Sequence, residues 1–180
     1  MYNGNNKTAL NSQKRIVEAM LEMVENESYD NITIKDICKR ANISRQRFYY
    51  LFESKDEIVM YYLNDFFIQL ETFINDNNII SLYDLIFQYF SAIDKDEYIK
   101  KFMHINNILP MFSDILLKFM GKIHILKTNR IMDKNDFYAN KFLSSGLNSI
   151  FIFWLEKNKE ITLQELVAII ENILRGKMFE

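Results

Sequence analysis

Apolar residues recur along the first part of the chain with the 3.6-residue period of an amphipathic helix. Positions 16, 19, 20, 23 and 24 are apolar, a spacing that places them on one helical face. The polar stretch 26–31 then predicts a turn, and the asparagine-rich residues 1–11 predict a frayed tail. One amphipathic helix is therefore expected to begin after Ser12.

Residues 33–52 predict two short helices joined by a tight turn. Thr33 and Ser44 are typical N-cap residues, and Asn42 tolerates the left-handed conformation that ends a helix. The side chains expected to face inward are Ile34, Ile37, Cys38 and Ala41 on the first helix and Phe48, Leu51 and Phe52 on the second. The pattern is that of a helix-turn-helix.

The remaining chain reads as further helices separated by polar breaks. Ser54 and Glu57 form a capping-box pattern that begins a longer helix reaching about Asn75, and Thr162 with Glu165 repeats the pattern near the end. Breaks are expected at 75–78, 94–97, near Pro110, at 128–136 and at 156–161. We therefore predict an all-α protein of about nine helices.

Composition agrees with this fold and excludes several function classes. Four Gly and one Pro are too few for a fold rich in β-turns, and one Cys with two distant His predicts neither disulfides nor a metal site. The sequence lacks a Gly-rich phosphate loop, G-x-S-x-G and H-E-x-x-H, so neither an enzyme nor a cofactor is expected.

No pattern in the sequence predicts export or membrane insertion. The N-terminal residues lack an apolar signal region. The longest apolar stretch without charges, residues 142–155, is too short and too polar to span a bilayer, and it predicts a buried helix. A cytoplasmic protein without membrane contacts is expected.

Charge is distributed unevenly along the chain. The whole chain has 22 basic and 24 acidic residues, but residues 33–55 have six basic and two acidic, a net charge of +4 against −6 for the rest. A local basic patch on a helix-turn-helix is typical of a DNA-binding protein, because the major groove admits one α-helix. The alternative for this pattern alone is a generic helical pair with a solvated basic face.

The segment TIKDICKRANISRQRFYYLFESKDEI resembles the N-terminal domain of TetR/AcrR family transcriptional regulators. The matching residues are Thr33, Asp36, Ile37, Ala41, Ile43, Ser44, Tyr49, Phe52, Ser54 and Lys55. The sequence departs from the family pattern at Ser28 and Asn42, where glycine is usual, and at Arg47 and Phe48. The Arg-Phe-Tyr-Tyr run is similar to the branch that contains the dihydroxyacetone-kinase regulator.

The resemblance implies a three-helix DNA-binding domain over residues 10–70 and a helical effector-binding and dimerisation domain over 71–180. It also implies that Arg45, Gln46 and Arg47 contact base edges of a double-stranded operator. The residues implied to contact phosphates are Thr33, Lys35, Ser44, Tyr49, Tyr50 and Lys55. We expect Tyr49 to pack partly inward and Tyr50 to face the DNA backbone.

A homodimer is expected from the apolar stretch 142–155 and the helix over 162–175, since small residues such as Gly146 permit close helix approach and the family pairs its last two helices. The predicted interface residues are Gly146, Ser149, Ile150, Phe153, Leu166 and Ile170. The alternative is a monomeric core helix pair.

A small apolar or aromatic effector is the expected ligand of the second domain. The predicted pocket residues are Phe66, Phe87, Phe90, Phe102, Met103, His104 and Phe112. Ordinary core packing is the alternative explanation for them. The function expected is therefore a repressor released by an effector; the alternatives are an activator, or a regulator or adaptor controlled by a protein partner without a small-molecule ligand.

Overall fold

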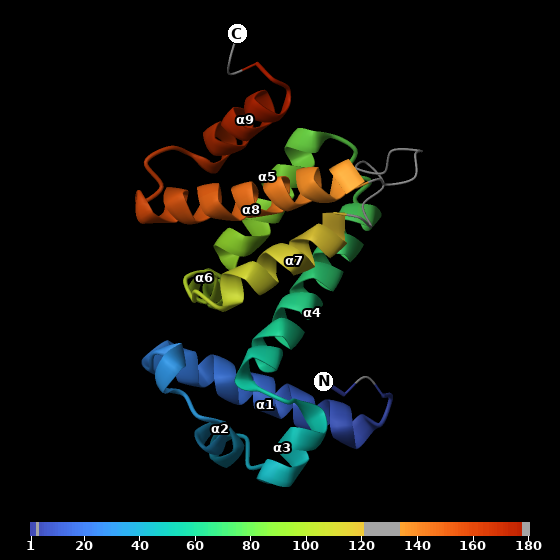
Figure 1. Ribbon diagram of the computed structural model, residues 1–180, viewed down its shortest axis with the longest axis vertical. Coiled ribbons are helices and arrows are strands. Elements are labelled where there is room, and N and C mark those ends of the chain that lie inside the picture. The colour runs from blue at the N-terminus through green and yellow to red at the C-terminus, as the bar shows by residue number, and fades with distance from the viewer. Residues whose placement is uncertain (3, 121–133, 178–180) are drawn as a thin grey trace. The chain divides into compact units, whose positions relative to one another are not determined.

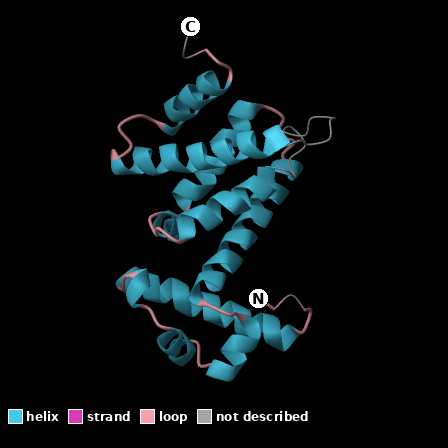
Figure 2. Ribbon diagram, viewed as in Figure 1, coloured by secondary structure: helices cyan, strands magenta, loops and turns pink. Residues whose placement is uncertain are grey.

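A computed structural model describes residues 1–2, 4–120 and 134–177, and for residues 134–136 it describes the backbone only. Within these ranges the chain forms nine α-helices and one short 3₁₀ turn and contains no strand (Figures 1 and 2). The predicted all-α class and helix number are confirmed for the described residues. The chain divides into two compact units, residues 1–65 and 66–180, and the division falls inside helix α4.

The first unit contains α1 (Lys7–Asn26), the 3₁₀ turn η1 (Tyr29–Asn31), α2 (Ile34–Arg40), α3 (Arg45–Leu51) and the first half of α4 (Lys55–Asp76). Helices α1, α2 and α3 pack against one another. Their shared core consists of fully buried side chains, among them Ile16, Met20, Ile37, Phe48, Leu51, Phe52 and Ile58. This shared burial stabilises α2 and α3, which have seven residues each and are too short to be stable alone.

The expectation of a frayed tail over residues 1–11 is wrong. Helix α1 begins at Lys7 because the side chain of Asn6 accepts hydrogen bonds from Thr8 N–H at 2.9 Å and Ala9 N–H at 3.2 Å. Ala9 and Gln13 are buried on the first turns of this helix. The asparagine that looked like part of a polar tail is therefore an N-cap.

The second unit contains the rest of α4 and five further helices: α5 (Leu82–Lys95), α6 (Glu97–Met103), α7 (Ile108–Met120), α8 (Lys134–Glu156) and α9 (Leu163–Leu174). Helix α7 packs along α8, and α5 packs against α9. Aromatic rings fill this core, with Phe90 and Phe151 centred 4.9 Å apart and Phe67 and Phe119 5.1 Å apart.

The predicted break near Pro110 lies just before the proline, because Pro110 itself is inside the first turn of α7. That position has no intrahelical acceptor for an N–H, so proline is tolerated there. The break falls between α6 and α7, over residues 104–107. The other predicted break over 128–136 lies partly outside the described residues, and α8 has begun by Lys134.

Helix α8 is not the fully buried helix expected from its apolar sequence. Phe142, Gly146, Ser149 and Phe153 are exposed and recur at intervals of four, three and four residues, which places them on one face. We call these four residues the α8 stripe. Its opposite side carries the buried Ser144, Asn148 and Phe151.

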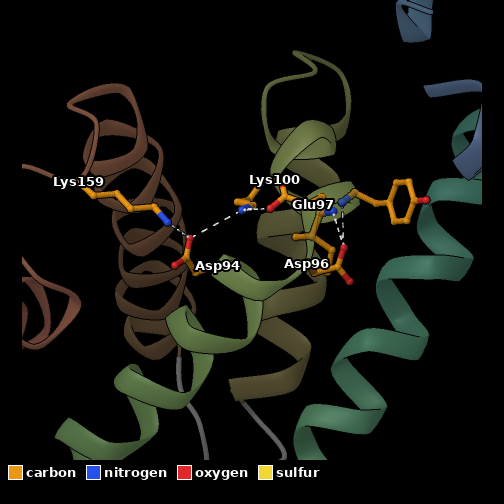
Figure 3. Close-up of polar contacts among 7 residues, drawn as sticks. Asp94, Asp96, Glu97, Lys100 and Lys159 are labelled. Atoms are coloured by element: carbon orange, nitrogen blue, oxygen red, sulfur yellow. Dashed lines mark hydrogen bonds and ion pairs between the residues drawn. The ribbon is translucent and has the colours of Figure 1, made fainter. Parts of the chain in front are cut away.

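A small polar network joins α5, α6 and the turn between α8 and α9. Figure 3 shows Asp94 between two lysines, 2.6 Å from the Lys159 ammonium and 3.9 Å from that of Lys100, which also pairs with Glu97 at 2.7 Å. Lys159 has a left-handed backbone with φ of 56°, and its ammonium lies 5.2 Å from the centre of the Trp154 ring. The network fixes the tight turn that leads into α9.

No helix within the described ranges is long and apolar enough to cross a membrane.

Candidate nucleic-acid interface

Helices α2 and α3 form the predicted helix-turn-helix, and the predicted caps begin both helices. The Thr33 hydroxyl accepts from Asp36 N–H at 3.2 Å, and the Ser44 hydroxyl accepts from Arg47 N–H at 3.1 Å. Asn42 has a left-handed backbone with φ of 50°, and Ile43 N–H bonds to Cys38 C=O at 2.9 Å. The turn between the helices is therefore built from the residues that the sequence indicated.

Arg15 on α1 fixes this turn, a role that sequence analysis missed. Its guanidinium donates to the carbonyl oxygens of Ala41 and Asn42, the latter at 3.1 Å. The charged donor satisfies two carbonyls at the end of α2, where the helical hydrogen bonds stop. Arg15 lies on the exposed side of α1, so in the sequence it could not be told apart from an ordinary solvated basic residue.

Helix α3 presents a buried and an exposed face. Phe48 and Leu51 are fully buried, whereas Arg45 and Gln46 are exposed and Arg47 is half-buried. The hydrogen bond with the Tyr49 side chain raises the pKa of the Arg45 guanidinium, a group that is charged at neutral pH in any case. The three side chains predicted to contact base edges thus stand at the N-terminal end of a short helix whose other face is held in the core.

Both tyrosines of α3 are exposed, and Tyr49, which was expected to pack partly inward, is covered over about half of its surface. Tyr49 is 49% exposed and Tyr50 is 57% exposed. Phe48, rather than Tyr49, fills the core at this turn, since three adjacent aromatic residues cannot all face inward on a helix. Tyr50 lies beside Arg47, whose guanidinium carbon is 5.2 Å from the ring centre.

Lys55, predicted to contact a phosphate, binds backbone carbonyls of the turn at residues 29–32 in this structure. Its ammonium donates to the carbonyl oxygens of Tyr29 at 2.7 Å, Ile32 at 3.2 Å and Asp30 at 3.3 Å. An ammonium has three N–H groups, and three carbonyl oxygens of this turn accept from it in the free protein. Lys55 therefore stabilises this turn in the free protein, and its phosphate contact stays a prediction.

The basic patch is smaller than the charge count suggested. Lys35 and Lys39 are exposed, but Arg40 pairs with Glu22 of α1 at 2.7 Å. Thr33 is exposed, and its hydroxyl also donates a hydrogen bond to the Asp36 carboxylate. Ser44, the N-cap of α3, is exposed as well. Lys35, Lys39 and Arg45 are exposed on α2 and α3, Arg47 is partly exposed, and the exposed Arg40 is paired with Glu22.

Cys38 and the other metal-binding residue types form no reactive cluster in the described part of the chain. Cys38 is buried, and burial raises the pKa of its thiol against the smaller opposing effect of Arg45. The described residues contain no group of three His, Cys, Asp or Glu side chains placed to hold a metal ion. Nothing in this geometry competes with the helix-turn-helix as the candidate functional site.

The predicted effector residues do not converge on one cavity. Phe90, Phe102, Met103 and Phe112 are buried in the core, and His104 is exposed. Phe87 is half-buried and stacks on Tyr83, whereas Phe66 lines an open groove between α4 and α5. Core packing, the alternative stated above, accounts for the four buried residues.

The predicted interface residues divide between surface and core. Gly146, Ser149 and Phe153 are exposed on the α8 stripe, and Ile150 is half-buried beside it. Leu166 and Ile170 on α9 are 3% and 4% exposed, because they pack inside the same subunit. These two residues therefore present almost no surface to a partner.

The sequence is similar to known bacterial transcriptional regulators. A sequence profile described as "Bacterial regulatory proteins, tetR family" matches residues 16–61. The biofilm operon icaADBC HTH-type negative transcriptional regulator IcaR of Staphylococcus epidermidis is 26% identical over 143 residues, 68% of this chain and 74% of IcaR. The HTH-type dhaKLM operon transcriptional activator DhaS of Lactococcus lactis is 32% identical over 74 residues, 41% of this chain and 38% of DhaS.

The fold also matches solved structures over nearly its whole length. Lin0861 from Listeria innocua superposes with a TM-score of 0.78 at 19% identity, covering 98% of this chain and 95% of Lin0861. The similarity in fold thus extends beyond the helix-turn-helix into the second unit.

Proposed function

Because this chain belongs to the TetR family of bacterial regulatory proteins, we propose that it is a repressor that binds a near-palindromic operator as a homodimer and is released by an effector. The chain is a DNA-binding transcriptional regulator and not an enzyme. The observation that carries the proposal is the exposed N-terminal end of α3, with Arg45 and Gln46 exposed and Phe48 held in the core.

The chemistry of these side chains suits base reading in the major groove. An arginine forms two parallel hydrogen bonds to guanine, and a glutamine does so to adenine. The exposed Lys35, Ser44, Tyr49 and Tyr50 flank this end of the helix-turn-helix and are proposed to contact phosphates. Base contacts then provide specificity, and phosphate contacts provide affinity that falls with salt.

Repression is favoured over activation by the extent of the two relatives' matches. The match to the negative regulator IcaR covers 68% of this chain, whereas the match to the activator DhaS covers 41%. The longer of the two sequence matches is thus to a negative regulator. The predicted branch within the family, that of the dihydroxyacetone-kinase regulator, stays a prediction.

The proposed dimer interface is the α8 stripe together with the neighbouring part of α9. Phe142 is 75% exposed and Phe153 is 56% exposed, an unusual solvent exposure for two large apolar side chains on one helical face. An apolar groove of about 140 Å³ between α8 and α9 continues this surface and is lined by Phe142, Gly146, Ile150 and Ile173, among others. A two-fold pairing of this face presents two α3 helices to a palindrome.

The proposed effector site is the groove between α4 and α5. Its volume is about 370 Å³, and it is lined by Phe66, Leu70, Phe73 and Lys95, among others. This size lies within the roughly 300–1,000 Å³ range of ligand pockets, whereas the apolar pocket beside Tyr89 and Leu116 has only about 60 Å³. Because α4 begins at Lys55, directly after the helix-turn-helix, a ligand that prefers one placement of α4 shifts the population that binds DNA.

Control by a protein partner is the second candidate, and the filled core favours it. Four of the seven expected pocket residues, Phe90, Phe102, Met103 and Phe112, are at most 1% exposed. A regulator of this kind binds its operator in the same way but has no small-molecule ligand.

The experiment that tests the DNA-binding proposal is selection from a randomised duplex library with the purified protein. We expect a near-palindromic sequence whose half-sites are about 10 base pairs apart, or a multiple of that spacing. Arg45→Ala and Gln46→Ala should each relax the preference at one position of each half-site. Recovery of random sequence by the wild-type protein would refute a sequence-specific regulator.

The direction of control and the effector site need separate measurements. A reporter promoter carrying the selected duplex should become less active when the protein is expressed, and an increase would favour activation. The fluorescent aromatic anion 8-anilinonaphthalene-1-sulfonate serves as the probe for the groove. We expect it to bind the wild-type protein, to bind Phe66→Glu more weakly, and to weaken operator binding. Binding at Phe66 without any change in operator affinity would favour control by a protein partner.

A further inference from the structure

We propose that Tyr2 is a positioning residue of the DNA-binding face, because it holds the ring of Tyr50 and, through that ring, the guanidinium of Arg47. This inference rests on the proposed DNA-binding function. It assigns a part in that function to the segment before α1, which carries Tyr2, Gly4 and Asn6 and which we call the N-terminal hook.

The N-terminal hook is fastened to the end of α3. Tyr2 N–H donates to the carbonyl oxygen of Leu51, the last residue of α3, at 2.9 Å. The carbonyl oxygen of Tyr2 accepts from the Gln13 amide on α1 at 3.0 Å, and its hydroxyl accepts from Asn6 N–H at 3.2 Å. Two of these bonds thus join the hook to α3 and α1, and the third closes within the hook itself.

This fastening places the Tyr2 ring against the exposed side of α3. The rings of Tyr2 and Tyr50 are centred 5.4 Å apart with an interplanar angle of 38°. The Arg47 guanidinium carbon lies 5.2 Å from the centre of the same Tyr50 ring. Tyr50 is therefore contacted both by the hook and by a residue proposed to read bases, although 57% of its surface remains exposed.

The tight contact between Gly4 and the Tyr2 side chain is a second observation that bears on where the Tyr2 ring lies. A β-carbon built at Gly4 would overlap the hydroxyl and the adjacent ring carbon of Tyr2. A side chain at position 4 therefore requires the Tyr2 ring to move. Gly4 offers a way to displace that ring without altering Tyr2, Tyr50 or Arg47 themselves.

Holding Tyr50 and Arg47 in advance lowers the cost of binding. A free arginine or tyrosine on a helix surface samples several rotamers, and DNA binding must restrict them. In this structure the stacked arrangement restricts both side chains before DNA arrives. Loss of Tyr2 is therefore expected to weaken DNA binding even if α3 stays folded.

The test measures affinity for a fluorescent duplex that the wild-type protein has selected from a randomised library. We expect Tyr2→Ala to weaken binding about three- to tenfold, the range for one aromatic or cation–π contact. Tyr2→Phe should restore binding to within about twofold, because it keeps the ring. Gly4→Ala should reproduce part of the loss, and Asn5→Ala, an exposed neighbour, should have no effect.

A double-mutant cycle with Tyr50→Ala separates positioning from other roles. If Tyr2 acts through Tyr50, adding Tyr2→Ala to Tyr50→Ala should weaken binding no further. An equal loss in both backgrounds would overturn the proposal, as would a Tyr2→Ala protein that binds like the wild type. Thermal melting of each variant identifies unfolding, and if Tyr2→Ala unfolds, the cycle with Gly4→Ala decides in its place. Failure of the wild-type protein to select any duplex would instead refute the DNA-binding function itself.

Discussion

The ammonium group of Lys55 lies 4.3 Å from the centre of the Tyr29 ring and donates a hydrogen bond to the carbonyl oxygen of the same residue at 2.7 Å. The Tyr29 hydroxyl in turn donates to the carboxylate of Asp56, the residue after Lys55. The first turn of α4 is thereby joined to the turn that precedes the helix-turn-helix. Two adjacent residues of α4 thus hold one tyrosine of the segment between α1 and α2.

Lys55→Met should destabilise the protein without changing the salt dependence of its DNA binding. The substitution keeps the aliphatic side chain but removes the donor to three carbonyl oxygens, and we expect a loss of about 1–3 kcal/mol in the free energy of unfolding. Urea unfolding measures this loss, and Lys35→Met at an exposed site of α2 is the matched control. The salt dependence of DNA binding should match that of the wild type. A slope reduced by about one would instead identify Lys55 as a phosphate contact.

Tyr29 should make the protein sensitive to alkaline pH. Burial, the hydrogen bond to Asp56 and the negative charges of Asp56 and Asp30 all raise its pKa above the ordinary value for tyrosine. Above about pH 10 the unfolded chain therefore loses a proton that the folded chain keeps, and the free energy of unfolding falls as pH rises. Tyr29→Phe should make this fall shallower by up to about 1.4 kcal/mol per pH unit. Urea unfolding between pH 8 and pH 11 measures the slope, and an unchanged slope would contradict the assignment.

The features predicted from sequence are those encoded locally. Helix periods and the caps Thr33, Ser44 and Thr162 depend on residues three or four positions apart, and the structure confirms all three caps. Arg15 and Tyr2 were missed because their partners, at Ala41 and Leu51, are distant in sequence and are backbone carbonyls that no side-chain pattern marks.

The second unit was harder to interpret for a different physical reason. Aromatic residues at helical spacing satisfy a packed core and a ligand pocket equally well, so Phe90 and Phe112 could not be assigned to either from their spacing. The exposure of Phe142 and Phe153 likewise depends on which neighbours cover α8, and the periodicity of a helix that is apolar on more than one face does not reveal it.

Gly146→Leu should affect the subunit and the dimer in opposite directions. A β-carbon at Gly146 meets no atom within 4 Å in its own subunit, and replacing glycine inside a helix improves helix propensity by about 0.8 kcal/mol. If two copies pair through the α8 stripe, however, the larger side chain keeps the helices apart. We expect at least a tenfold weaker dimer, measured by analytical ultracentrifugation over a range of concentrations.

The matched control for this prediction is Ile68→Glu on α4, which changes a residue that is 56% exposed and lies outside the α8 stripe. Its dimer should be as tight as that of the wild type. Gly146→Ala adds a single methyl group and should fall between the wild type and Gly146→Leu. Unchanged dimerisation of Gly146→Leu would move the interface away from α8.

The buried trio of Tyr89, Asn148 and Ser113 should show strong non-additivity. The Tyr89 hydroxyl donates to Asn148 Oδ1 at 2.7 Å, and Asn148 Nδ2 donates to Ser113 Oγ at 3.0 Å, all within the core of the second unit. Tyr89→Phe leaves the amide oxygen without this donor, and we expect it to cost about 1–3 kcal/mol in the free energy of unfolding. Adding Asn148→Leu removes the unsatisfied group, and Ser113 keeps its bond to the Leu109 carbonyl at 3.2 Å. The double variant should therefore be at least as stable as Tyr89→Phe alone, whereas independent contributions would make it clearly less stable; urea unfolding of the four proteins distinguishes the two outcomes.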